Sequence, residues 1–353
     1  MQTRVAFRKG RIVMKTSSFL QLALTALFLT ACDREIPIEP GADGDGHTAP
    51  TRATAALNAA VLEELDFADR QGFEDASRGL IASDPTLQVR ANDDSLIWDL
   101  EANKFIAGDA PASVNPSLWR QARLNNIHGL FEVTEGIYQL RGFDLSNMTL
   151  IEGRTGWIGV DPLTARETAR AAFAFAMQHL EQRPIVAVIF THSHFDHFGG
   201  VLGLLAGGEV QSENLRIIAP EGFMEEATSE NILAGPAMSR RAMFMSGKQR
   251  ARSERGHVDS GLGISPAFGS VGLLEPTEII DRTPQVLEID GIEFVFQNAP
   301  GSEAPAELTF YLPHARAFNG AEVTSHNMHN LYTLRGAKVR DALRWSNYID
   351  ESI

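Results

Sequence analysis

Three histidines and one aspartate follow an apolar run in the middle of the chain. The run 185–190 reads Ile-Val-Ala-Val-Ile-Phe and predicts a buried β-strand. His192, His194, Asp196 and His197 come directly after it. Imidazole and carboxylate groups are ligands that suit Zn²⁺, with Mn²⁺ and Fe²⁺ as further possibilities. The spacing predicts that His192 and His194 hold one metal ion and that Asp196 and His197 begin a second site. The alternative is a polar loop that happens to be rich in histidine.

The overall composition is that of an acidic globular protein. The 353 residues include 31 Lys and Arg against 45 Asp and Glu, a net charge of −14, and 44% are hydrophobic. This balance argues against a nucleic-acid partner. It does not exclude a small anionic substrate, because a local pair of arginines can reverse the field within a cleft. A single cysteine excludes a disulfide framework and a thiolate metal cluster.

The first part of the chain resembles a secretory leader. An apolar run from Phe19 to Ala31 follows Lys15, and Leu-Thr-Ala-Cys at its end resembles a bacterial lipobox with Cys32 as the lipidated residue. We expect a signal peptide over 1–32, and a periplasmic protein that contacts the membrane only through its lipid anchor. An ordinary signal peptide with an incidental cysteine is the alternative. The Pro- and Gly-rich residues 33–54 predict a flexible linker, which leaves 55–353 as the catalytic domain.

Strand and helix patterns predict an α+β domain. Apolar runs predict strands at 137–140, 148–151, 157–160, 185–190 and 216–220, and a second strand series between 286 and 318. The segment 164–181 reads as a helix with a capping box formed by Thr164 and Glu167. Residues 116–119 belong to a region that we expect to hold short strands and loops. Two sheets with helices outside them predict an αββα sandwich.

Carboxylates elsewhere in the chain are needed to complete a site for two ions. Glu303 follows a predicted strand and its turn, and Glu322 follows the last strand of the second series. Glu307 is the rival of Glu303, and it could instead be a solvent-facing or supporting residue. Asp161, at the end of the strand 157–160, could orient a ligand histidine through its free ring N–H, or it could be a turn residue.

A polar segment near the end of the chain combines histidine, asparagine and arginine. It contains His326, His329, Asn330, Arg335 and Arg340. Arginine suits bidentate contact with an oxyanion, and asparagine adds a neutral donor. His329 could act as a general acid. We therefore predict Asn330, Arg335 and Arg340 as substrate-binding residues. A polar helix face is the alternative.

These motifs resemble the metallo-β-lactamase superfamily and, within it, the alkyl sulfatase branch. The longest segment that resembles this branch is Thr-His-Ser-His-Phe-Asp-His-Phe-Gly-Gly at 191–200. Further segments resemble the same branch in the same order: 115–120, 136–139, 141–147, 301–307 and 326–330. The resemblance extends over residues 65–353 and implies hydrolysis of detergent-type alkyl sulfate esters to alcohol and inorganic sulfate.

The resemblance also implies roles for individual residues. Two Zn²⁺ ions are implied, with Glu303 as the third ligand of the first ion and Glu322 as a bridge. Asp196 and His197 serve the second ion, Asn330 and Arg335 hold the sulfate, and His329 lies beside the scissile ester oxygen. His329 and Asp196 are thus the implied catalytic residues.

Members of the branch continue beyond the position that matches Ile353. Their remaining part supplies one more histidine ligand and a dimerisation region, which implies a homodimer for the full-length relatives. We therefore expect the sandwich to be incomplete at its C-terminal end. Another ester or lactone hydrolase of this superfamily is one alternative, and an inactive fragment is another.

Overall fold

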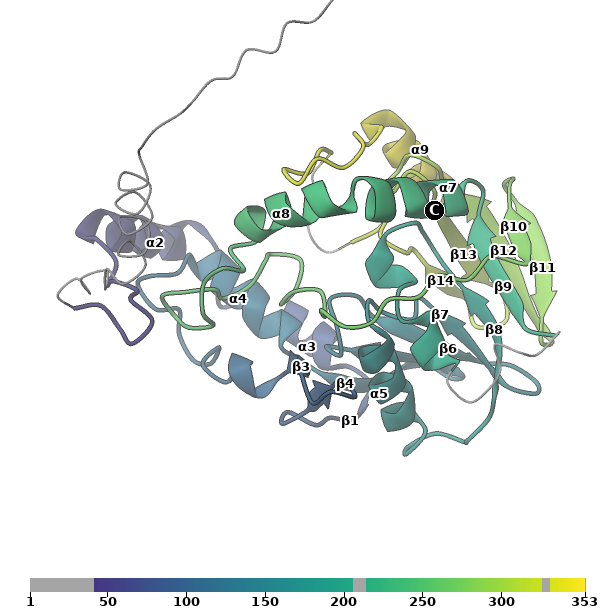
Figure 1. Ribbon diagram of the computed structural model, residues 1–353, viewed down its shortest axis with the longest axis horizontal. Coiled ribbons are helices and arrows are strands. Elements are labelled where there is room, and N and C mark those ends of the chain that lie inside the picture. Colours follow the sequence, from purple (N-terminus) through teal and green to yellow (C-terminus); the bar gives the residue numbers. More distant parts are fainter. Residues whose placement is uncertain (1–40, 206–213, 326–330, 353) are drawn as a thin grey trace, which may run out of the picture. The chain divides into compact units, whose positions relative to one another are not determined.

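The computed structural model of the chain describes residues 41–205, 214–325 and 331–352. The chain divides into two compact units, Met1–Thr48 and Ala49–Ile353. The helices and strands described below belong to the second unit (Figure 1). Cys32 and the predicted leader lie outside the described residues. Of the helices in the described ranges, none combines the length and the apolar character needed to cross a membrane.

The larger sheet has eight strands in the spatial order β1-β4-β5-β6-β7-β8-β9-β10. These strands are β1 (Leu80–Ala82), β4 (Gly129–Thr134), β5 (Ile137–Arg141), β6 (Met148–Glu152), β7 (Trp157–Val160), β8 (Ile185–Ile189), β9 (Arg216–Pro220) and β10 (Glu278–Ile280). Neighbours from β1 to β7 are antiparallel, and their strands include those predicted at 137–140, 148–151 and 157–160. Neighbours from β7 to β10 are parallel, so the carboxyl ends of β7, β8 and β9 meet at one edge.

The smaller sheet is an antiparallel meander of four strands in sequence order. They are β11 (Gln285–Ile289), β12 (Ile292–Asn298), β13 (Leu308–Leu312) and β14 (Ala317–Asn319). Asp290 and Gly291 join the first two strands, with φ values of 47° and 85°. An Asp-Gly pair with positive φ at both residues is the turn that the twist of a two-residue hairpin requires. The carboxylate of Asp290 also accepts a hydrogen bond from the backbone N–H of Thr155 (2.7 Å), which ties the two sheets together.

An apolar core fills the space between the two sheets. Within β8, Ala187 and Ile189 belong to this core, whereas Val188 belongs to the core on the opposite face. This alternation is the pattern of a strand whose two faces are both covered. The smaller sheet contributes large side chains, among them Phe294 and Phe310, whose rings lie 5.3 Å apart. The facing sheets therefore share one continuous buried layer.

Helices cover the outer face of each sheet. On the larger sheet the layer is formed by α5 (Arg166–Ala176), α6 (Val201–Leu204) and α7 (Phe223–Thr228). The small side chains Ala169, Ala172 and Ala176 are fully buried there, so α5 approaches the sheet closely. On the smaller sheet, α9 (Ala342–Ser352) is attached through Gln297 of β12, which donates to the Tyr348 carbonyl (3.1 Å). This order of layers confirms the αββα sandwich.

The remaining elements precede the sandwich or connect its strands. They are α2 (Arg52–Glu64), α3 (Gln71–Ser77), β2 (Gln88–Arg90), β3 (Leu96–Asp99), η1 (Glu101–Asn103), α4 (Pro116–Asn125), η2 (Phe195–His197), η4 (Ser229–Leu233) and α8 (Gly235–Met245). Helix α2 begins three residues before Ala55, inside the expected linker, because the side chain of Thr51 accepts a hydrogen bond from the Thr54 N–H.

Two local expectations were wrong. Residues 116–119 form the start of helix α4 rather than a strand or loop. The Asn115 side chain caps this helix by accepting from the Ser117 N–H (2.8 Å), and Pro116 has the fixed φ that suits a first helical turn.

The capping box predicted at Thr164 and Glu167 does not form. Helix α5 begins at Arg166, after an Ala165 N-cap that has no side-chain hydrogen bond. The Thr164 hydroxyl donates instead to buried Asp144 (2.6 Å), and the Glu167 carboxylate accepts from the Ser270 N–H (2.9 Å). Tertiary partners therefore replace the local contact that the spacing favoured.

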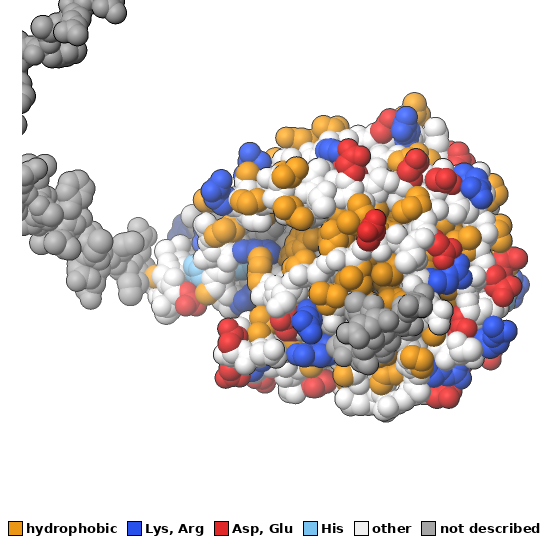
Figure 2. Space-filling model, turned by 45° about the vertical axis from the view of Figure 1, so that its right-hand side comes forward, with side chains coloured by type: hydrophobic (Ala, Val, Ile, Leu, Met, Phe, Trp, Pro, Cys, Tyr) orange, Lys and Arg blue, Asp and Glu red, His pale blue; other side chains and the backbone are white. Residues whose placement is uncertain are grey.

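Large apolar side chains are also exposed on the surface. The most exposed include Leu233 (81%), Phe244 (75%) and Leu334 (75%), which belong to η4, α8 and the segment before α9. In the face drawn in Figure 2, hydrophobic side chains form extended patches between scattered charged groups. Patches of this kind are typical of surfaces that contact an apolar ligand or another protein.

Candidate metal centre

The candidate site lies where strand ends from both sheets meet. The His loop, residues 191–197, follows β8 at the carboxyl edge of the larger sheet. Its backbone pairs with the start of β13: the Leu308 N–H donates to the Thr191 carbonyl (2.8 Å), and the Ser193 N–H donates to the Ala306 carbonyl (3.1 Å). This pairing brings the turn between β12 and β13 beside the His loop.

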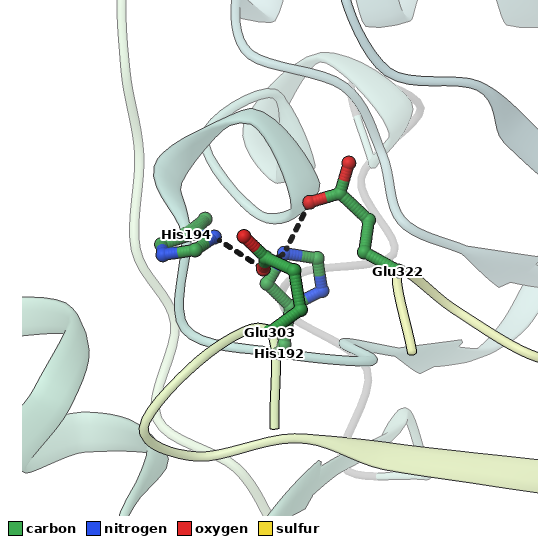
Figure 3. Close-up of side chains that lie close together, drawn as sticks. All are labelled: His192, His194, Glu303 and Glu322. Carbon is green, nitrogen blue, oxygen red and sulfur yellow. Dashed lines mark ion pairs between the residues drawn. The ribbon is translucent and has the colours of Figure 1, made fainter. Parts of the chain in front are cut away.

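Four side chains form a compact cluster at this junction (Figure 3). His192, His194, Glu303 and Glu322 each offer one ligand atom, and these atoms lie within 4.8 Å of one another. Nδ1 of His194 is 2.9 Å from Oε2 of Glu303, and Nε2 of His192 is 3.4 Å from Oε2 of Glu322. The structure thus brings both predicted carboxylates to the histidines.

The second predicted set, Asp196, His197 and Glu322, adjoins the first. Nε2 of His197 is 3.4 Å from Oδ2 of Asp196 and 3.8 Å from Oε2 of Glu322. The same Glu322 oxygen lies close to His192, so it faces ligands of both sets. This position fits the bridging role that the family resemblance implies for Glu322.

The ring nitrogens indicate that a cation fits this site. Among the described residues, Nε2 of His192 and Nε2 of His197 are buried without a hydrogen-bond partner. A buried polar atom without a partner costs about 1–3 kcal/mol. Both nitrogens face carboxylate oxygens across gaps of 3.4 Å or more. Imidazoles and carboxylates arranged in this way match the donor set of Zn²⁺.

Further contacts hold two of these imidazoles from behind. Oδ2 of Asp161, at the end of β7, is 2.8 Å from Nδ1 of His197 and accepts a hydrogen bond from the Thr191 hydroxyl (2.7 Å). The Thr191 hydroxyl is in turn 3.0 Å from Nδ1 of His192. These contacts occupy Nδ1 of each ring and direct Nε2 towards the carboxylates. The structure therefore gives Asp161 the orienting position considered for it.

Glu307 is fully buried, and its carboxylate contacts the turn that carries Glu303. Its carboxylate accepts hydrogen bonds from the Ser302 hydroxyl (2.7 Å) and the Ala304 N–H (2.9 Å). Burial and the neighbouring charge of Glu303 raise the pKa of Glu307 to about 8. The structure thus separates the two rivals: Glu303 faces the imidazoles, and Glu307 supports the turn that carries it.

Arg340 differs from our expectation of a substrate-binding residue. Its side chain is 3% exposed, and its Nη2 lies 2.9 Å from Oε1 of Glu303. Its Nε donates to the Glu303 carbonyl (2.6 Å), and its Nη1 donates to the Lys338 carbonyl (3.3 Å). These donors are directed into the protein, so Arg340 positions Glu303 from behind rather than lining an open anion pocket.

Arg335 is half-buried beside the site. Burial lowers the pKa of His194, Glu303 raises it by more, and the positive charge of Arg335 opposes Glu303. The guanidinium is thus close enough to act on the His194 imidazole through space. His326, His329 and Asn330 lie outside the described residues, so their predicted roles stay predictions.

Burial and crowded charges shift the pKa values of the cluster. Burial and the neighbouring His197 and His194 hold the pKa of His192 well below its usual value. Burial raises the pKa of Glu303, but His194 and His192 outweigh it and hold that pKa well below the usual range. Burial and the charge of Glu303 raise the pKa of Glu322 to about 7. A divalent cation would relieve the repulsion between these carboxylates.

One residue that faces the site was not predicted from the sequence. Glu230 lies in the π-helical turn η4, is 5% exposed, and has its Oε2 at 3.7 Å from Nε2 of His194. No spacing or neighbouring motif distinguishes this glutamate from others in the same helical stretch. The π-helical turn is a signal, since such turns are frequent at functional sites, but it is visible only in the structure.

Comparison with known proteins shows which family and which relatives the chain is similar to. The profile of the metallo-beta-lactamase superfamily matches residues 141–283. The chain is 48% identical over 84% of its length to the alkyl/aryl-sulfatase BDS1 of Saccharomyces cerevisiae, covering 46% of that protein. It is 48% identical over 86% of its length to a linear primary-alkylsulfatase of Pseudomonas sp., covering 45% of it.

A solved structure shares the same fold. The stereoselective inverting sec-alkylsulfatase Pisa1 from Pseudomonas sp. superposes with a TM-score of 0.83 at 47% identity, over 87% of this chain and 48% of that one. The chain thus spans about half the length of the relatives that it matches. The family profile, the sequence identity and the shared fold show that the chain belongs to the metallo-β-lactamase superfamily and is similar to alkylsulfatases.

Proposed function

We propose that the chain carries the metal centre of an alkyl sulfatase, a binuclear zinc hydrolase that converts alkyl sulfate esters to alcohol and inorganic sulfate. The observation that carries this proposal is the convergence of His192, His194, Glu303 and Glu322 from separate strand ends. Identity of 48% to alkylsulfatases supports the substrate class.

The proposed ligands divide between two ions. His192, His194 and Glu303 hold the first, Asp196 and His197 hold the second, and Glu322 bridges them. Zinc bound here would supply Lewis acidity towards water and towards the oxygen atoms of the ester. The protein itself supplies fixed ligand positions, because Asp161 and Arg340 hold ligand side chains from behind.

Residues of the polar segment complete the proposed site. Arg335 and Asn330 would bind the sulfate group and stabilise its charge as it leaves. His329 would donate a proton to the leaving ester oxygen. The acidic net charge is compatible with this role, since the influence of Arg335 on His194 supports a local positive field.

Metal analysis combined with hydrolysis tests the proposal. The purified chain is dialysed against Zn²⁺, its metal content is measured by mass spectrometry, and release of sulfate from dodecyl sulfate is followed. Two ions per chain with sulfate release is the expected result. A panel of carboxylic esters and lactones is measured in parallel, and hydrolysis of these without sulfate release would contradict the proposed substrate class. A chain that binds no metal would contradict the proposal as a whole.

We also propose a periplasmic location with a lipid anchor on Cys32, based on the leader-like sequence alone. Homodimer formation, as the resemblance implies for full-length relatives, is part of the same proposal. Mass spectrometry of the membrane fraction from cells that express the chain should detect a lipidated Cys32. The C32S variant should leave that fraction, and its retention there would contradict the anchor.

A further inference from the structure

We propose that Glu230 is a positioning residue that fixes His194 and couples the metal centre to the loop 331–340. We call this segment the anion loop because it carries Arg335. The inference rests on the proposed function and adds to it a residue that neither the motif nor the family resemblance supplied. Three sets of contacts link Glu230 to His194, to the His loop and to the anion loop.

The first set concerns the two nitrogens of His194. Nδ1 lies 2.9 Å from Glu303, on the side of the proposed ion. Within the described residues, the opposite nitrogen, Nε2, is buried and has no hydrogen-bond partner, and Oε2 of Glu230 lies 3.7 Å from it. A metal-ligating histidine usually donates its other ring N–H to a carboxylate or carbonyl. A shift of less than 1 Å would give His194 such a contact with Glu230.

The pattern of the other two histidines supports this assignment. His197 has Asp161 behind its ring, and His192 has Thr191, which donates to the same aspartate. Glu230 occupies the equivalent place behind His194. Each of the three imidazoles then has one nitrogen towards one of the two proposed ions and the other towards a group that fixes the ring.

The second set of contacts attaches η4 to the His loop. The side chain of Asn231 donates to the Ser193 carbonyl (3.2 Å) and to the Ala227 carbonyl (2.8 Å). The backbone beside His194 is therefore held by the residue next to Glu230. A glutamate that is 5% exposed is costly unless its charge is compensated, and a protonated or metal-bound imidazole provides that compensation.

The third set connects Glu230 to the anion loop. Its Oε1 accepts a hydrogen bond from the Lys338 N–H (3.0 Å). The Arg340 N–H donates to the Leu331 carbonyl (2.8 Å) and closes the base of the loop, while the Arg340 side chain binds Glu303. The anion loop is thus attached to two proposed ligands, to His194 through Glu230 and to Glu303 through Arg340.

The structure provides a matched control for Glu230. Glu226 lies on the preceding helix α7, and its Oε2 is 2.5 Å from Nζ of Lys338. It therefore contacts Lys338 of the anion loop, and within the described part of the chain it forms no ion pair with His192, His194 or His197. Replacing Glu226 with glutamine disturbs its contacts with Lys338 and Ser229, whereas replacing Glu230 disturbs the loop anchor and His194.

Zinc affinity of the full chain, measured by competition with a chromogenic chelator, tests the inference. E230Q should weaken binding of the first ion by about 10- to 100-fold, the range typical for loss of a residue behind a metal ligand. E226Q should stay within about twofold of wild type. In zinc-loaded protein, E230Q should also weaken binding of inorganic sulfate by about fivefold or more, the lower end of ordinary coupling between sites.

The outcomes separate this inference from the proposed function. Zinc binding by wild type with equal affinity in E230Q would overturn the role of Glu230 and leave the metal centre in place. Equal losses in E226Q and E230Q would assign the effect to the loop and also overturn it. A wild type that binds no zinc would overturn both proposals. If E230Q does not fold, E230D with bound Co²⁺ replaces it, and visible absorption bands and affinity identical to wild type would contradict the inference.

Discussion

The two proposed ligand sets differ in how deeply they are buried. In the first set, the side chains of His192, His194 and Glu303 are 0%, 7% and 1% exposed. In the second set, His197 is 8% and Asp196 is 13% exposed, and Glu322, which faces both sets, is 31% exposed. The first set is enclosed by the protein, whereas the second has an open side formed by its carboxylates.

The supporting contacts follow the same division. The Glu303 carboxylate accepts a hydrogen bond from the buried Arg340 side chain (2.9 Å). Glu322 is held by a longer contact, in which its backbone N–H donates to the Glu307 carboxylate (3.3 Å). Ligands that are held in place before an ion arrives lose little freedom when they bind it. An enclosed set favours tight binding, and an open set leaves room for a substrate beside the ion. The difference predicts a holding role for the first set and a substrate-facing role for the second.

Removal of one ligand from each set would test this division most strongly. H194A should abolish binding of the first ion and reduce hydrolysis of dodecyl sulfate by at least about 10,000-fold, or about 5.5 kcal/mol of barrier. D196A should retain one ion per chain, because the enclosed set is intact. Metal content after dialysis, measured beside the rate, checks both variants. Two ions retained by H194A would contradict the division.

The contact between Arg340 and Glu303, which holds a ligand of the first set in place, can be removed by a separate substitution. In the metal-free protein, R340M removes one charged partner of buried Glu303 and leaves His194 as another, which should reduce the free energy of unfolding by about 3 kcal/mol, the lower end for a broken buried ion pair. R344M is the matched control, because the pair between Arg344 and Asp341 is exposed and should contribute at most about 1 kcal/mol. Urea unfolding of both variants measures the two effects. Equal small losses would show that the enclosed set does not depend on Arg340.

His128 is a reference for the ligand histidines because it is a buried imidazole outside the site. Its ring packs 4.4 Å from Phe143, and burial lowers its pKa to about 4. Between pH 6.5 and 4 the unfolded chain binds a proton at this residue that the folded chain does not. Above pH 6.5, His128 therefore causes no loss in the free energy of unfolding. As the pH decreases from 6.5 to 4, this residue should lower the free energy of unfolding by a total of about 3 kcal/mol.

The pH dependence of unfolding in H128Q measures this contribution. The pKa of His257 is also lowered to about 4, by burial and by Arg252, so wild type and variant must be compared over the same range. The variant should lose less stability than wild type between pH 6.5 and 4. A surface substitution, H179Q, serves as a second reference. Parallel curves for wild type and H128Q would contradict the assignment.

The smallest expected effect is the difference in affinity between the two ions. Preorganisation of the first set should make its zinc affinity at least about tenfold higher, which corresponds to about 1.4 kcal/mol. Calorimetric titration of the metal-free chain should then show two steps. A single step with two equal sites would indicate that burial of the ligands does not determine their affinity.

Much of the site could be predicted from the sequence because several of its ligands lie close together in the chain. Four ligand residues occur within six positions, directly after a strand whose apolar run is unmistakable. Strand ends also led to Glu303 and Glu322. The pattern did not decide between Glu303 and Glu307, since both stand near a strand end and both are carboxylates. Their hydrogen bonds distinguish them, and those depend on how the turn folds.

Residues that act through other residues were harder to predict. Arg340 was assigned to the substrate because arginine suits oxyanions, but its donors are used by Glu303, 37 positions away. Glu230 was missed because its contact with His194 spans 36 positions and leaves no local pattern. The capping box at Thr164 failed for a related reason, since buried Asp144 offered a stronger partner than the helix end.

The sequence by itself determined the chemistry of the His loop and the strands that form the two sheets. Alternating and continuous apolar runs reflect which strand faces are covered, and ligands that lie within six positions of one loop are close together for local reasons. Only the tertiary structure showed that these carboxylates reach the histidines and decided which groups hold the ligand side chains in place. Those contacts join segments from different strand ends, and their strength comes from burial, which no single segment possesses before the two sheets pack together.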